Sequence, residues 1–77
     1  MIFLIEYDRA RGSLVTLKRF DDSRREEAWK ERLEMELSLN RQGVDREVVL
    51  LEAETEEALR RTHRRYFEDL TELTEAR

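Results

Sequence analysis

Residues 2–5 read Ile-Phe-Leu-Ile and residues 48–51 read Val-Val-Leu-Leu, two apolar runs in which no polar residue alternates. Both runs have the length and the aliphatic or aromatic composition of β-strands. A strand that is apolar on both faces is typical of a sheet that is covered from above and from below. We therefore expect a small sheet whose two faces both need a covering layer.

The composition indicates one small domain of a cytoplasmic protein. A chain of 77 residues buries a modest core and has a thin margin of stability. It contains no cysteine, so no disulfide or thiolate zinc site can stabilise it, which suits a reducing compartment. The first apolar run ends at Glu6 and is too short for a secretory signal or a membrane span, so we expect no membrane partner.

Charged residues make up 44% of the chain, and 15 basic against 19 acidic residues give a net charge of −4. A general nucleic-acid binder usually has a net basic domain, so this balance argues against one. The mixture of signs instead indicates helices whose charged side chains pair with one another.

The first half of the sequence predicts a β-hairpin followed by a long helix. Strands are expected at 2–7 and 13–20, joined by a tight turn in which Gly12 can adopt a positive φ. Ser23 with Glu26 fits a capping box that opens a helix from Arg24 to Gln42. Gly43 follows as a left-handed C-terminal residue.

The second half reads as a strand followed by a helix. The strand is expected at roughly 46–53, and Thr55 is the expected N-cap of a helix from 56 to about 70. The fold class is therefore α+β, with the order β-β-α-β-α in a single domain at 1–70. Residues 71–77 are expected to extend the last helix or to form a frayed tail.

The strands at 2–7 and 46–53 are the most apolar, and we place the first of them in the centre. This predicts a three-stranded mixed sheet of order 2-1-3 with both helices packed on one face. The other face and the apolar edge of the third strand would then need a partner, most simply a second copy of the chain. The candidate interface residues are Phe3, Ile5, Val49, Leu51 and Trp29.

The long helix has two apolar stripes. Trp29, Leu33 and Leu37 form one, and Ala28, Met35 and Leu39 form the other. Together they are wider than a helix needs for docking on one sheet. We expect one stripe to meet the sheet and the other to meet the last helix; the alternative is that one stripe lies in an intermolecular contact.

The last helix carries four arginines around His63, and they are the candidate contacts to an anion or a nucleic acid: Arg60, Arg61, Arg64 and Arg65. Guanidinium groups can bind phosphates, and the neighbouring Tyr66 could stack on a base. Each arginine also has an acidic residue four positions away along the helix, which predicts ion pairing instead. An acidic protein partner is an intermediate possibility.

No catalytic, metal-binding or cofactor-binding residue is expected. Met1–Asp8 resembles the first strand of CRISPR-associated ferredoxin-like nucleases, in which an Asp follows the strand, but the expected hairpin departs from that fold. Carboxylates at the strand ends, such as Glu6 and Asp8, could converge on Mg²⁺, but their spacing matches no known signature and we expect turn and cap chemistry instead. His63 is the single histidine, and no glycine-rich phosphate loop is present.

The sequence thus predicts a small non-enzymatic protein-interaction module that forms a homodimer through a sheet face or a strand edge. The alternative is RNA or DNA binding through the arginine face of the last helix. A metal-dependent nuclease is the remaining, remote option.

Overall fold

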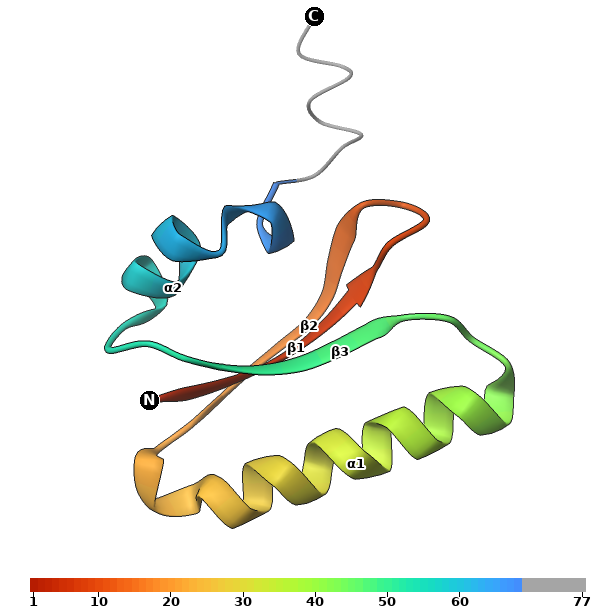
Figure 1. The fold of residues 1–77 in the computed structure, drawn as a ribbon, viewed down its shortest axis with the longest axis horizontal. Helices are drawn as coiled ribbons and strands as arrows, with labels where there is room; N and C mark the ends of the chain where they lie inside the picture. The colour runs from red at the N-terminus through yellow and green to blue at the C-terminus, as the bar shows by residue number, and fades with distance from the viewer. Residues whose placement is uncertain (69–77) are drawn as a thin grey trace, which may run out of the picture.

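The computed structural model describes residues 1–68 and has the α+β class that the sequence predicts (Figure 1). The predicted extension or tail at 71–77 lies outside the described residues. The elements in chain order are β1 (Ile2–Asp8), β2 (Ser13–Phe20), the 3-10 turn η1 (Asp22–Arg24), α1 (Arg25–Gln42), β3 (Glu47–Glu52), α2 (Glu56–Thr62) and the 3-10 turn η2 (Arg64–Tyr66).

The sheet has the predicted strand order β2-β1-β3, but it is antiparallel throughout rather than mixed. In the central strand β1, Leu4 lies opposite Lys18 of β2 on one side and opposite Leu50 of β3 on the other. The crossover through α1 makes β2 and β3 parallel to each other. Because β1 lies between them, no parallel pair of neighbours results, and the prediction of a mixed sheet was wrong.

The two helices cover opposite faces of the sheet, as Figure 1 shows, so the prediction that both pack on one face is corrected. On one face, Ile2 and Leu4 pack against Ala28 of α1. On the other face, Phe3 and Ile5 pack against Leu59 of α2. Because β1 is apolar on both sides, each face needs its own cover, and each helix supplies one.

The two glycines adopt the positive φ that the sequence predicts, at 65° for Gly12 in the hairpin turn and 69° for Gly43 after α1. This region is open to glycine without strain. Thr55 caps α2 as predicted, because its Oγ1 accepts a hydrogen bond of 3.1 Å from the N–H of Ala58. The capping box at Ser23 was wrong: Ser23 lies inside η1, and α1 begins at Arg25 without a side-chain cap.

The last helix is shorter than predicted, because α2 ends at Thr62 and the chain bends at His63. The bend carries η2 back over the sheet, where Tyr66 is 5% exposed and packs edge-on against Tyr7 at 5.3 Å between ring centroids. Burial of this aromatic ring outweighs the helix propensity of the segment.

The cover that α2 provides is tested by Leu59→Ala, because Leu59 is fully buried between α2 and the sheet. Loss of such a side chain should lower the free energy of unfolding by about 2–5 kcal/mol, measured by urea denaturation. The matched control is Arg61→Ala, an exposed position of the same helix where the change should stay within about 0.5 kcal/mol. Equal effects of the two variants would contradict the packing of α2 on this face.

Candidate protein-interaction surface

The outer side of β3 is an open strand edge. The N–H of Ala53 donates a 3.1 Å hydrogen bond to the carbonyl oxygen of Met1 in the extension of the β1–β3 pair. In an antiparallel strand both backbone groups of a residue point to the same side, and the side alternates along the chain. The backbone groups of Val48, Leu50 and Glu52 therefore point away from β1, and no other strand of residues 1–68 pairs with them.

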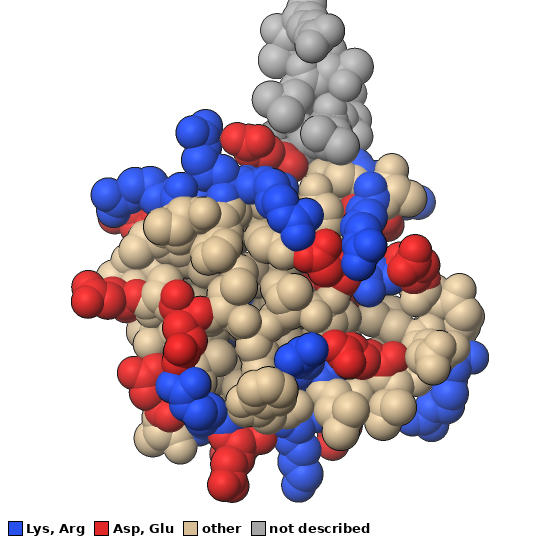
Figure 2. Space-filling view, in the orientation of Figure 1, with Lys and Arg blue, Asp and Glu red and all other residues tan. Residues whose placement is uncertain are grey.

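The side chains along this edge are mainly apolar. Val48 is buried, and Val49, Leu50 and Leu51 are half-buried. Figure 2 shows uncharged atoms across the middle of this side of the molecule, between the charged side chains of α2 and those of α1. An open edge with apolar side chains is a template for pairing with another chain.

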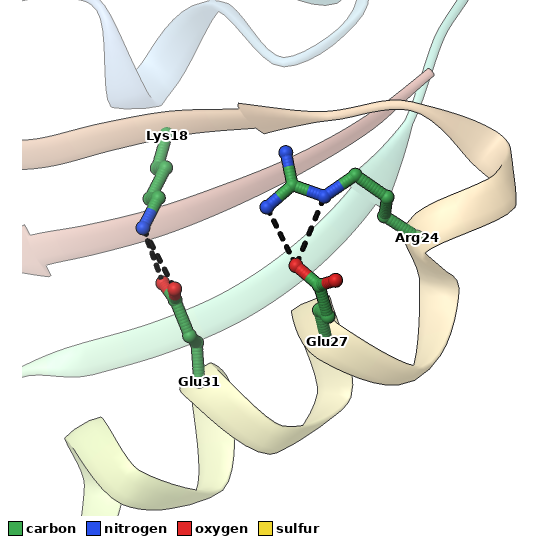
Figure 3. A network of polar contacts seen from close by, with 4 residues as sticks. All are labelled: Lys18, Arg24, Glu27 and Glu31. Atoms are coloured by element: carbon green, nitrogen blue, oxygen red, sulfur yellow. Dashed lines mark hydrogen bonds and ion pairs between the residues drawn. The ribbon is translucent and has the colours of Figure 1, made fainter.

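Two ion pairs show how α1 is turned on the sheet. Lys18 of β2 places its Nζ 2.7 Å from Oε1 of Glu31, and Figure 3 shows this pair next to the pair of Arg24 and Glu27. On the opposite flank of α1, Arg25 pairs with Glu52 of β3. One flank of the helix therefore faces β2, and the other faces the open edge of β3.

The pair of Arg24 and Glu27 near the start of α1 has two hydrogen bonds, with Nε and Nη2 of Arg24 at 2.9 and 2.6 Å from Oε2 of Glu27. The bond to Arg24 lowers the pKa of the Glu27 carboxyl, and the bond to Glu27 raises the pKa of the Arg24 guanidinium. Both side chains are exposed, so the pair contributes little to stability.

An apolar stripe of α1 lies on the flank that faces the β3 edge. Trp29, Leu33 and Leu37 are 56%, 57% and 48% exposed, although all three are large apolar side chains. Trp29 lines a small hollow together with Leu50 and Glu52 of β3, so the stripe continues the apolar surface of the strand edge.

The two predicted stripes of α1 have different outcomes. The stripe of Ala28, Met35 and Leu39 packs on the sheet, as expected for one of them. The stripe of Trp29, Leu33 and Leu37 does not meet α2, because α2 lies on the other face. Within residues 1–68 this stripe is therefore left exposed.

The five predicted interface residues lie in three different environments. Phe3 and Ile5 are fully buried beneath α2, so they do not line a free surface. Val49 and Leu51 are half-buried on that same face of β3, and Trp29 is exposed on α1. The exposed apolar surface therefore lies at the edge of β3 and on the flank of α1, and not on the sheet face as predicted.

Each arginine of the predicted anion-binding cluster lies beside a carboxylate. The pairs are Arg60 with Glu56 at 3.2 Å, Arg61 with Glu57 at 3.8 Å, Arg64 with Glu68 at 3.4 Å and Arg65 with Glu47 at 2.5 Å. Three of these pairs follow the predicted spacing of four residues. The fourth was expected to join Arg65 to Asp69, which lies outside the described residues, and Arg65 instead pairs across to β3.

Sequence reasoning missed the partners of Glu47 at the start of β3. Its carboxylate accepts a hydrogen bond from the hydroxyl of Tyr66 and pairs with Arg65 and Arg9. The bond from Tyr66 lowers the pKa of Glu47 below the usual value for glutamate. Burial raises the pKa of Tyr66, and the bond to Glu47 raises it further. The network joins η2 to the sheet.

Sequence reasoning also missed a nearly buried carboxylate at Glu6 of β1. It accepts a 2.8 Å hydrogen bond from Thr16 Oγ1 and pairs with Nη1 of Arg46 at 2.6 Å. Both carboxylate oxygens of Glu6 therefore have protein partners. In residues 1–68, no group of three or more His, Cys, Asp or Glu side chains is placed to hold a metal ion.

The chain was compared with family models, curated proteins and solved structures, and none of them matches it. Within the described residues, no helix has both the length and the apolar character that crossing a membrane requires. The functional argument therefore rests on the surfaces described above.

The network around Glu47 predicts how stability changes with pH. Because the pKa of Glu47 is lowered by folding, the unfolded chain binds more protons in acid, and the free energy of unfolding should fall as the pH drops below the usual glutamate range. Because the pKa of Tyr66 is raised by folding, stability should also fall as the pH rises above about 10.

The variant Tyr66→Phe isolates the tyrosine contribution, with urea denaturation at several pH values as the measurement. The substitution should lower the free energy of unfolding by about 1–3 kcal/mol at neutral pH, because the carboxylate of Glu47 loses a hydrogen-bond donor. It should also make the decrease in the free energy of unfolding above about pH 10 smaller. An alkaline loss identical to that of the unmodified chain would show that another group causes it.

Proposed function

We propose that this chain is a small, non-enzymatic protein-interaction module that acts as a homodimer through the open edge of β3. One observation carries the proposal: β3 is the apolar edge strand, and its outward backbone groups have no partner strand in residues 1–68. A second copy of the same strand offers the complementary donors and acceptors when the two run antiparallel.

The two edges of the sheet differ in a way that favours β3. The opposite edge, β2, exposes Lys18 and Arg19, and charged side chains of this kind protect an edge from pairing. In β3 the charges stand at the two ends, at Glu47 and Glu52, and the four residues between them are aliphatic. Pairing at β3 therefore brings aliphatic side chains together without burying a row of charges.

The other functional readings have less support. The four arginines of α2 and η2 already have acidic neighbours, and the net charge is −4, so nothing in the structure favours RNA or DNA as the partner. The paired state of Glu6 and Glu47 supports a non-enzymatic role. The absence of cysteine from the sequence suits a reducing compartment, so we also propose a cytoplasmic location.

The first test is the absolute mass by light scattering over a concentration series. We expect a species of twice the 9.4 kDa chain mass that dissociates on dilution. A monomer at every concentration would overturn the proposed homodimer.

The edge itself is tested by Leu50→Pro, which removes an N–H that points outward from β3. Proline at such a position leaves the hydrogen bonds to β1 intact and blocks the addition of a strand. The dissociation constant of the dimer should rise at least about tenfold, since each copy loses a bond and gains a steric conflict.

The matched control is Leu17→Pro on the opposite edge. Leu17 lies opposite Ile5, whose backbone groups face β3, so the N–H of Leu17 also points outward. Both leucines are half-buried, and circular dichroism checks that both variants fold. If the two variants dimerise equally well, the β3 edge is not the interface.

A further inference from the structure

We infer that the stripe of Trp29, Leu33 and Leu37 is the second half of the same interface, covered in the homodimer by α1 of the second copy. This inference rests on the proposed homodimer and adds to it which helix surface becomes buried. A strand edge of six residues is a small contact, whereas stable interfaces usually bury at least about 1,200 Å² in total. A helix surface beside the edge supplies the additional area.

When two β3 edges pair, the two copies of α1 come within packing distance of each other. α1 packs on both β1 and β3, so its axis lies roughly above the space between these strands. Neighbouring strands are about 4.8 Å apart, so a two-fold axis that pairs two copies of β3 lies half of that distance outside β3. The axis of α1 lies about the same distance on the inner side of β3, so the two axes are about 5 Å apart. The two copies of α1 would then be about 10 Å apart, close to the 8–10 Å at which helices pack.

Trp29 points toward that two-fold axis, and Leu33 and Leu37 follow progressively farther around the helix, away from the sheet. With about 100° per residue, Trp29 lies about 100° and Leu33 about 140° around the helix from Ala28, which faces the sheet. The flank occupied by Arg25 and Trp29 is the one that faces β3, as the pair of Arg25 with Glu52 shows. Trp29 and Leu33 therefore project sideways beyond the strand edge, and Leu37 lies at the outer margin.

Charge complementarity favours a second copy as the occupant. When two copies of α1 run antiparallel about Leu33, Trp29 meets the partner's Leu37. The charged residues beside the stripe carry both signs: Glu26, Lys30, Arg32 and Glu36. The apolar residues thus meet apolar residues, and the mixed charges beside them do not bring two rows of like charge together.

Trp29 reports on this contact directly, because it is the single tryptophan of the chain and is 56% exposed in the isolated protomer. Over the concentration range in which light scattering shows the dimer forming, its emission should shift to shorter wavelength and its quenching by acrylamide should fall. The unmodified chain, at concentrations where light scattering shows only the monomer, supplies the reference for an exposed Trp29.

The variant Leu33→Glu tests the energetics. It places a charge at the centre of the stripe in both copies, and the dissociation constant should rise about a hundredfold. Val15→Glu is the matched control, because Val15 is an exposed aliphatic residue, 44% exposed, on the strand at the opposite edge. Circular dichroism checks the folding of both variants.

Three outcomes separate this inference from the proposed function. A dimer with protected Trp29 that is weakened by Leu33→Glu but not by Val15→Glu supports both. A dimer in which Trp29 is quenched as in the diluted monomer, and which tolerates Leu33→Glu, overturns the inference and leaves the homodimer in place. A protein that is monomeric at every concentration overturns both.

Discussion

The structure depends on one constraint, the burial of β1 on both faces. Ile2 and Leu4 point to one face of the sheet, Phe3 and Ile5 point to the other, and none of the four is more than 2% exposed. A strand of this kind must be central and must have a layer above and below it. The chain meets this requirement with α1 on one side and with α2 and η2 on the other. The 68 described residues therefore form three layers, with the sheet in the middle and β1 as its central strand.

This division of the covering layers explains where apolar surface remains open. A single helix per face is sufficient for β1 but leaves β3 half-covered at the edge, and it leaves α1 with one apolar stripe more than the sheet can receive. The polar surface behaves differently, since most of the acidic and basic side chains discussed above lie in pairs. The contrast between paired charges and exposed apolar surface is the physical basis of the proposed interaction role.

Local sequence signals predicted the fold well where the decisive interactions are local. The hairpin turn at Gly12, the end of α1 at Gly43 and the Thr55 cap follow from nearby residues and are confirmed. The strand order is confirmed as well, and it was predicted from the apolar character of whole strands. The errors concern long-range packing. Nothing within the α2 segment indicates which face of the sheet it will cover, and the bend at His63 depends on contacts of Tyr66 with Tyr7 and Glu47 far away in the sequence. For the same reason Phe3 and Ile5 were expected at an interface although α2 buries them. Trp29 is exposed, and its place in an interface stays a prediction.

The crossover through α1 also sets the order in which the chain can assemble. β1 and β2 are joined by a short turn and can pair almost as soon as both exist, but the partner of β1 on its other side, β3, begins only at Glu47. Closing this long loop has an entropic cost that local pairing does not have, so contacts of β1 with β3 form late. Until then the hairpin presents Ile2–Ile5 along a free edge with neither face covered. The strand that makes the folded chain stable is therefore the one that exposes a nascent chain to misassociation, and the time that α1 and β3 need to dock limits how long that exposure lasts.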